Sequence, residues 1–215
     1  MSLRAVIFDY GMVLSAPADP VAHQELIDIF GASPAAFEEQ YWAHRHAYDA
    51  GALDGPAFWQ ACAEGAGITL TTPQVDSLIA TDIRMWSSIN QTMVDWALAL
   101  GRAGIRIGVL SNIGLELVPA LKETHPFLAS FDHCTWSCDL RLAKPDPAIY
   151  QHTLEQLDVR PDEALFLDDR KENVAAARSL GIDAIVFENA AQLHAELESR
   201  GLAELLPPVA FTAVR

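Results

Sequence analysis

Basic residues are scarce in this 215-residue chain, in which 14 lysines and arginines stand against 29 acidic residues and the formal net charge is -15. Proteins that bind nucleic acid use a basic surface to neutralise backbone phosphates. We therefore expect no nucleic-acid partner. Long apolar runs are also missing, and none approaches the about 20 residues that a membrane-spanning helix needs. We expect no membrane partner either.

Cysteine is rare as well, with only Cys62, Cys134 and Cys138 in the chain. Their odd number and the lack of any Cys-x-x-Cys spacing argue against a disulfide framework or a zinc site. The N-terminal residues also lack the basic, then apolar, then small-residue order of a secretion signal. These features predict a cytoplasmic protein with reduced thiols.

The chain does contain enough apolar residues, 51% of the total, to bury a sizeable core. Its first apolar run, Ala5 to Phe8, stops abruptly at Asp9, and Gly11 follows. This pattern predicts a buried strand that carries Asp9 at its carboxyl end, where ligands bind in open parallel sheets. Taken alone, Asp9 could equally cap a following helix.

Residues 15–88 show helix-start signals and no strand-like alternation. Four pairs or triplets of capping residues and proline open four helical patterns: Asp19-Pro20, Ser33-Pro34, Asp54-Gly55-Pro56 and Thr71-Thr72-Pro73. We interpret residues 15–88 as a small all-helical cap domain inserted after the first strand.

From Gln91 onward, helical and strand patterns alternate. Strands are predicted at 105–110, 131–136, 164–167 and 183–187, with helices at 92–103, 114–124, up to 157, 171–180 and 190–199. Such alternation favours right-handed crossovers and a parallel sheet. The predicted fold is a doubly wound, Rossmann-like α/β core of residues 1–14 and 89–215, with residues 15–88 as its cap.

Three of the predicted strands are followed by polar residues. Asp9 follows the first strand, Ser111-Asn112 follow the strand at 105–110, and Asp168-Asp169 follow the strand at 164–167. Lys144 lies between the last two of these strands. The carboxyl ends of parallel strands share one edge, so we expect one crevice to collect them. Carboxylates suit Mg²⁺, while hydroxyl, amide and lysine groups suit phosphate oxygens. This set predicts phosphoryl transfer to Asp9.

A carboxylate is a suitable nucleophile for this reaction, because it is normally ionised at neutral pH without a neighbouring base and its acyl phosphate can be cleaved by water. Repulsion between Asp9 and an anionic substrate would be offset by Mg²⁺ and by Lys144.

Four stretches resemble the motifs of the haloacid dehalogenase superfamily. They are Phe8 to Leu14, Leu110-Ser111-Asn112, Lys144 to Pro147, and Phe166 to Asn173. The helical insertion resembles the superfamily's first cap class. The resemblance implies that Asp9 is the nucleophile and that Asp169 ligates Mg²⁺. It also implies that phosphate is bound by Ser111, Asn112 and Lys144. Asp168 and Asn173 would contact the metal ligands or reach the metal through water.

The chain departs from the superfamily's usual phosphatase pattern at Gly11, where most members carry an aspartate that protonates the leaving group. The resemblance still implies that the Gly11 backbone carbonyl ligates Mg²⁺, so the metal site would be Asp9, Gly11 and Asp169. General acid-base help is worth about 10²- to 10⁴-fold in rate. Its loss should matter least for good leaving groups.

Three functional hypotheses remain open at this stage. The first is a Mg²⁺-dependent phosphatase of small phosphorylated metabolites with an aspartyl-phosphate intermediate. The second is a low-activity or non-catalytic binding or regulatory protein on the same fold. The third is a 2-haloacid dehalogenase, for which halide needs no acid; the acidic pair Asp168-Asp169 speaks against it, because it would repel a carboxylate substrate.

The cap offers candidates for substrate selection in Trp42, Arg45 and His46, although aromatic residues on that helix could equally pack into the cap's own core. We expect the cap to move about hinges near Ser15 to Pro17 and Ser87-Ser88. An apolar face on the cap would also allow a homodimer.

Overall fold

A parallel five-stranded sheet forms the centre of the core in the computed structural model, which describes residues 3–203 and 206. The strands are β1 (Ala5–Phe8), β2 (Arg106–Ser111), β3 (His133–Trp136), β4 (Ala164–Asp168) and β5 (Asp183–Val186). Their order is β3-β2-β1-β4-β5. The chain moves outward from β1 to β3 and then crosses to β4 on the other side of β1. The switch in direction therefore lies at β1, as the doubly wound fold requires.

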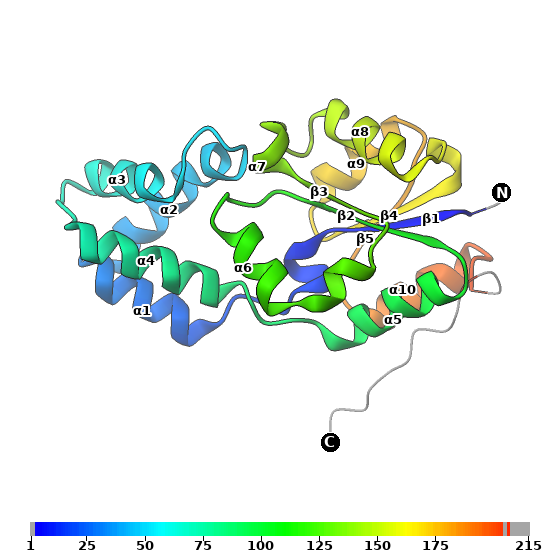
Figure 1. Ribbon diagram of the computed structural model, residues 1–215, viewed down its shortest axis with the longest axis horizontal. Coiled ribbons are helices and arrows are strands. Elements are labelled where there is room, and N and C mark those ends of the chain that lie inside the picture. Colours follow the sequence, from blue (N-terminus) through cyan, green and yellow to red (C-terminus); the bar gives the residue numbers. More distant parts are fainter. Residues whose placement is uncertain (1–2, 204–205, 207–215) are drawn as a thin grey trace, which may run out of the picture.

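Each face of the sheet is covered by helices (Figure 1). Side chains alternate across a strand, so Val6 and Phe8 join one apolar core, while Ala5 and Ile7 join the other. The first core includes residues of α5 (Gln91–Arg102), α6 (Leu117–Thr124) and α10 (Ala190–Ser199), and the second those of α8 (Pro147–Leu157) and α9 (Lys171–Ser179). The predicted doubly wound α/β core is confirmed.

Most predicted boundaries in the core agree with the structure to within a few residues. The exceptions surround the carboxyl end of the sheet. Helix α6 begins at Leu117 rather than at Gly114, and a short helix α7 (Ser137–Leu140) was not predicted. Gly114 and Glu116 lie outside α6 because they contact the inserted segment, as described below.

Four helices lie between β1 and α5: α1 (Pro20–Phe30), α2 (Pro34–Asp49), α3 (Gly55–Ala66) and α4 (Thr72–Met85). Asp19, Ser33 and Asp54 each accept a hydrogen bond from the first turn of the helix that follows, which explains why the starts were readable in the sequence. Aromatic rings fill the space between the helices. We refer to residues 15–88 as the cap, and this domain boundary stays our interpretation.

The two chain passages between the core and the cap lie side by side. Ser15 pairs with Ile89 in an isolated antiparallel bridge. The Ala16 amide donates to the Ser88 carbonyl over 2.9 Å, and the Asn90 amide donates to the Leu14 carbonyl over 2.8 Å. The passages coincide with the segments for which we predict hinges; movement there stays a prediction.

The loop after β2 holds the cap against the core. The Glu116 carboxylate accepts hydrogen bonds from the Tyr48 hydroxyl (2.9 Å) and from the Gly55 amide (2.6 Å). A Cβ at Gly114 would lie 2.1 Å from the Tyr48 ring, so only glycine permits this approach. The Ser137 hydroxyl of α7 also donates to the Asp49 carbonyl at the end of α2. The cap is therefore docked on the carboxyl edge of the sheet.

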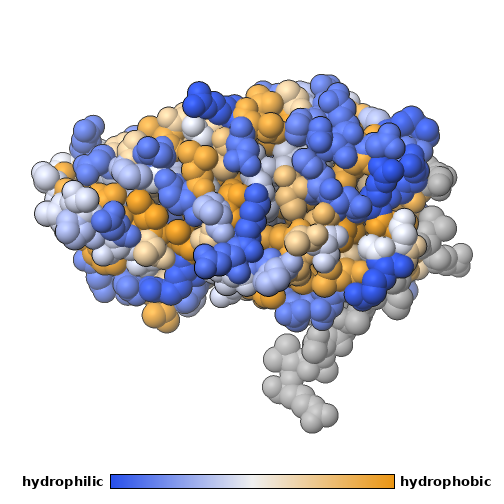
Figure 2. Space-filling view, in the orientation of Figure 1, coloured by the Kyte–Doolittle hydropathy of each residue, from blue (hydrophilic) through white to orange (hydrophobic). Residues whose placement is uncertain are grey.

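The surface is mixed in character. On the face shown in Figure 2, hydrophobic side chains appear in patches separated by hydrophilic ones. Four large hydrophobic residues are exposed among those described: Met12, Val21, Trp42 and Leu115. Over residues 3–203, no helix combines the length and the apolar character that crossing a membrane requires.

A matched pair of glycine substitutions tests the docking of α2. Gly51 and Gly67 have almost the same positive φ, 68° and 67°, but a Cβ at Gly51 would lie 2.6 Å from the Cys138 carbonyl oxygen, whereas nothing lies within 4 Å at Gly67. Gly67→Ala should cost about 1–2 kcal/mol from backbone strain alone. Gly51→Ala should lower the free energy of unfolding by roughly 1–3 kcal/mol more than Gly67→Ala does, because the backbone at Cys138 must shift to make room for the added methyl group. Urea unfolding of both variants measures the difference, and equal costs would contradict the docked position of α2.

Candidate active site

The carboxyl ends of β1, β2 and β4 bring the predicted polar residues together. Phe8 lies opposite Val109 on β2 and Leu167 on β4, so the residues that follow these partners flank Asp9. The Asp9 amide donates to the Leu167 carbonyl over 2.8 Å, which continues the sheet by one residue. The backbone then turns sharply, and Met12 adopts a φ of 61°. The Asp9 side chain is thereby held at the edge of the sheet.

Lys144 connects two of the acidic residues. Its ammonium lies 2.9 Å from Asp9 Oδ1 and 2.7 Å from Asp168 Oδ2. Its side chain is 1% exposed, and those of Asp9 and Asp168 are 10% and 0% exposed. A buried charge is tolerated only where it is paired and hydrogen-bonded. Each of these three groups therefore depends on the others.

Asp168 is occupied in holding its neighbours in place. Besides Lys144, its carboxylate accepts hydrogen bonds from the Arg170 amide (2.8 Å) and from the Asn173 side-chain amide (3.0 Å to each oxygen). Asn173 is fixed in turn, because its backbone carbonyl accepts a hydrogen bond from the Tyr150 hydroxyl. This arrangement is consistent with the supporting role predicted for Asp168 and Asn173.

Asn112 lies in the same crevice and contacts the Lys144 backbone. Its side-chain oxygen accepts a hydrogen bond from the Lys144 amide (2.7 Å), and its side-chain nitrogen donates to the Lys144 carbonyl (2.9 Å). The amide group thus clamps the Lys144 backbone, while Asn112 also lines the cavity and its predicted binding of phosphate stays a prediction. Ser111 is buried and lines the same cavity, with its hydroxyl 3.4 Å from the Asn112 carbonyl.

The charge state of Asp9 depends on its surroundings. Burial raises the pKa of its carboxyl group to about 8, although Lys144 pulls in the opposite direction. The nearby Asp168 carboxylate adds to the rise. No histidine or other base contacts Asp9 among the described residues, so ionisation without a neighbouring base stays a prediction. The charged form of Asp9 depends on Lys144 and on any further cation at the site.

Three carboxylates in this site could hold such a cation. Single oxygen atoms of Asp9, Asp168 and Asp169 all lie within 4.8 Å of one another. Oxygen donors of this kind suit Mg²⁺. Asp169 has no ion pair within the described residues, whereas the other two carboxylates already contact Lys144. The donor set therefore fits a divalent cation, with Asp169 as its freest carboxylate.

A cavity of about 240 Å³ lies between this edge of the sheet and the cap. Asp9, Gly11, Ser111, Lys144 and Asp169 line its core side, together with Asn112, Arg170 and Asn173. On the cap side are Trp42, Arg45, Asp49 and Trp86. The core and the cap thus share a single cavity in which a ligand would contact both.

The helical repeat explains which predicted cap residues reach this cavity. Trp42, Arg45 and Asp49 lie three and four residues apart on α2 and so share one face. His46 is exposed and is not among the residues that line the cavity, so its role in substrate selection stays a prediction without support from this geometry. Asp49 and Trp86 were missed. The spacing from Arg45 could have indicated Asp49, but nothing local in the sequence indicated Trp86, which reaches the cavity from the end of α4.

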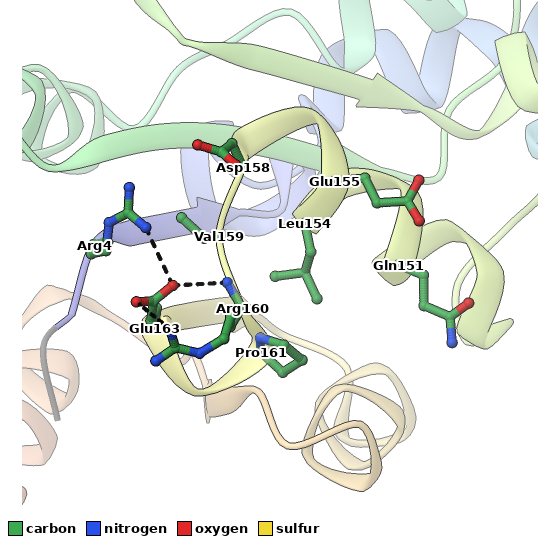
Figure 3. A pocket seen from close by; sticks show the side chains of 9 residues that line it. All are labelled: Arg4, Gln151, Leu154, Glu155, Asp158, Val159, Arg160, Pro161 and Glu163. Atoms are coloured by element: carbon green, nitrogen blue, oxygen red, sulfur yellow. Dashed lines mark hydrogen bonds and ion pairs between the residues drawn. The ribbon is translucent and has the colours of Figure 1, made fainter.

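A second cavity, of about 610 Å³, lies near the amino ends of β1 and β4 and is shown in Figure 3. Two of its cationic side chains pair with Glu163: Arg4 lies 3.4 Å from one carboxylate oxygen, and Arg160 Nη1 lies 3.2 Å from the other. It contains none of the predicted site residues. The carboxyl edge of the sheet is therefore the better candidate for an active site.

Comparison with known proteins gives a family match over most of the chain. The model of the haloacid dehalogenase-like hydrolase family matches residues 3–181. The chain is 32% identical over 115 residues to bifunctional epoxide hydrolase 2 of Mus musculus, a match that covers 52% of this chain and 21% of that protein. It spans only about a fifth of the length of that relative.

Two further similarities cover most of the chain. (S)-2-haloacid dehalogenase 4A of Burkholderia cepacia is 28% identical over 194 residues, which are 86% of this chain and 82% of that enzyme. A HAD family enzyme from Bacteroides thetaiotaomicron, solved with magnesium and inorganic phosphate, superposes with a TM-score of 0.71 at 22% identity and covers 89% of this chain and 99% of that one. The structural likeness concerns the fold.

The clamp on Lys144 can be tested with Asn112→Ala. Loss of two hydrogen bonds should lower the free energy of unfolding by about 1–3 kcal/mol. It should also weaken binding of inorganic phosphate by about tenfold or more, because Lys144 is no longer held in place. Asn189→Ala, which removes a helix cap on α10 and should cost about 1 kcal/mol, is the control for stability alone. Calorimetry that gives equal phosphate affinities for the two variants would refute the clamp.

Proposed function

Because the chain belongs to the haloacid dehalogenase-like hydrolase family, we propose that it is a Mg²⁺-dependent phosphatase of small phosphorylated metabolites, which acts through an aspartyl phosphate on Asp9. The observation that carries this proposal is the single cavity lined by Asp9, Ser111, Lys144 and Asp169. A nucleophile, two groups for phosphate oxygens and a carboxylate for a cation lie in it together. The similar fold solved with magnesium and inorganic phosphate supports the same chemistry.

Mg²⁺ would be held by the Asp9 and Asp169 carboxylates and by the Gly11 backbone carbonyl. When bound, it supplies positive charge that neutralises the phosphoryl oxygens. Asp168 would act from behind, since its oxygens already accept hydrogen bonds from Lys144, Arg170 and Asn173. The chain's own contribution is a fixed set of oxygen donors beside the nucleophile.

In the reaction, an Asp9 carboxylate oxygen attacks phosphorus while the bond from phosphorus to the ester oxygen breaks. Lys144 stabilises the phosphoryl oxygens and keeps Asp9 in its charged form, and the Ser111 hydroxyl donates to a further oxygen. Water then attacks the aspartyl phosphate and releases inorganic phosphate and free Asp9. The cap keeps bulk water out during the first step.

Gly11 leaves the ester oxygen without an aspartate to protonate it. The leaving oxygen must take its proton from water, so esters of acidic alcohols and phenols should react fastest. This restriction is the main way in which the proposed enzyme differs from phosphatases that carry aspartate at this position.

The other two hypotheses have less support. A 2-haloacid dehalogenase would bind a carboxylate substrate, and three carboxylates already gather at the site. The similarity to (S)-2-haloacid dehalogenase 4A nevertheless makes halide release a necessary second assay. A binding protein would not need Asp9, Lys144 and Asp168 to be organised around a nucleophile. We also propose that the enzyme acts in the cytoplasm.

The central prediction concerns p-nitrophenyl phosphate. Purified protein should hydrolyse it in the presence of Mg²⁺, lose activity with EDTA, and fall by at least about 10³-fold as Asp9→Asn, because the amide cannot serve as a nucleophile. Release of p-nitrophenol measures all three conditions. Asp139→Asn, which changes an acidic residue outside the cavity, should retain full activity.

Two results would overturn the proposed function. Hydrolysis that survives EDTA would remove Mg²⁺ from the mechanism. Halide release from a 2-chloro acid without any phosphatase activity would establish the dehalogenase instead, and trapping of Asp9 by beryllium fluoride without turnover of either substrate would favour the binding protein.

The missing acid gives a prediction for Gly11→Asp. Gly11 has a φ of -60°, which suits any L-residue, and no atom lies within 4 Å of an added Cβ. The variant should raise kcat/KM for alkyl phosphates by about 10- to 10²-fold and change that for aryl phosphates much less, because only alkoxide leaving groups need the proton. Gly11→Asn is the control without an acid. An equal gain on both ester classes would contradict this account.

A further inference from the structure

The cap side of the active-site cavity contains one basic and one acidic residue on the same face of α2. Arg45 and Asp49 are four residues apart, and Arg45 Nε donates to Asp49 Oδ1 over 2.8 Å. Their side chains are only 11% and 14% exposed, and both line the cavity. The pair therefore faces the part of a substrate that lies away from Asp9.

Behind this pair lies a buried network that fixes it. The Tyr41 hydroxyl accepts hydrogen bonds from Arg45 Nη1 and from Trp86 Nε1 (3.2 Å), and it donates to Asp82 Oδ1 over 2.8 Å. Asp82 Oδ1 also lies 3.6 Å from Arg45 Nη1. Arg45 and the Trp86 ring are thus set in position from behind by Tyr41 and Asp82.

This network carries no net positive charge. One guanidinium faces two carboxylates, Asp49 and Asp82, and burial raises the pKa of both acids while Arg45 opposes the rise. The group is neutral if one acid is protonated and carries one negative charge if neither is. Asp82 Oδ2 is buried and has no hydrogen-bond partner among the described residues, which leaves still less room for added negative charge.

The other two cations that line the cavity come from the core and not from the cap. Lys144 lies at the phosphate end between Asp9 and Asp168, and the Arg170 guanidinium pairs with Glu172 over 2.6 Å. A substrate with a second anionic group would find no unmatched cation at the cap end. Within the described part of the chain, the lining therefore favours a leaving group without charge.

The cap end still offers polar contacts to a neutral group. Arg45 Nη2 and Asp49 Oδ2 make no hydrogen bond to any described residue, so the pair presents one donor group and one acceptor atom. Trp42, Trp86 and Met12 supply apolar surface in the same lining. Donor, acceptor and apolar surface together match a hydroxyl on a carbon skeleton.

We propose that Arg45 and Asp49 select phosphate monoesters whose leaving group is uncharged and carries a hydroxyl, and that they discriminate against esters with a second anion. Asp49 accepts a hydrogen bond from this hydroxyl, and Arg45 donates one to it. The inference rests on the proposed phosphatase function for its turnover readout. Its binding readout is independent of that function.

Two aryl esters of nearly equal size provide the test: 4-(hydroxymethyl)phenyl phosphate and 4-carboxyphenyl phosphate. The wild-type protein should favour the hydroxymethyl ester by about tenfold or more in kcat/KM, since even 1.4 kcal/mol of like-charge repulsion has that effect. Phenyl phosphate is the reference without either group. It should lie between the two.

The variant Asp49→Asn identifies the source of the discrimination. Asparagine keeps an acceptor oxygen but removes the negative charge, so the preference for the hydroxymethyl ester over the carboxylate should fall at least threefold. Asp76→Asn is the matched control, because it removes one carboxylate from an exposed position of the same cap outside the cavity. Its preference should equal that of the wild type. A fall of the same size in both variants would assign the effect to overall charge and overturn the role of Asp49.

Binding separates this inference from the phosphatase chemistry. Affinities of the same two esters are measured with the Asp9→Asn protein by tryptophan fluorescence, since Trp42 and Trp86 line the cavity. Selective binding of the hydroxymethyl ester without turnover by the wild type would sink the proposed function and leave the inference standing. Turnover with equal affinities and equal kcat/KM for both esters would sink the inference alone, as would failure of both esters to bind.

Discussion

The contact of Lys144 with Asp9 and Asp168 is the constraint on which the site depends. A buried ammonium between two buried carboxylates leaves no member free to move without exposing the others to an unpaired charge. Asn112, directly after β2, holds the lysine backbone, and Asn173 of α9 holds Asp168. Three separate strand ends and one loop are thereby joined through a single charged group.

The rest of the architecture places this contact at the interface with the cap. The loop after β2 contributes Ser111 and Asn112 to the site, and a few residues later it uses Gly114 and Glu116 to hold the cap. The same short segment thus serves the chemistry and the position of the residues that would select the substrate. The core side of the cavity provides charge, and the cap side provides aromatic surface and a balanced ion pair.

Much of this arrangement could be predicted from the sequence, because its signals are local. The apolar run that ends at Asp9 indicates the end of a strand, and Asp19 before Pro20 indicates the start of a helix. Both signals depend on neighbouring residues alone. What the sequence could not show involves distant partners. It does not show that the Asn112 side chain meets Lys144, and the pKa of Asp9 depends on burial that only the folded chain creates. Trp86 was missed for the same reason.

The pairing of Ser15 with Ile89 affects how the inserted segment can change during evolution. The insertion leaves and rejoins the core at adjacent points. The entropic cost of bringing these two points together rises only slowly with the length of chain between them, so the long insertion costs the sheet little more than a short hairpin would. The module between them can lengthen, shrink or be exchanged with little effect on how the sheet assembles. Selectivity and reaction chemistry are therefore free to diverge at separate rates within one polypeptide.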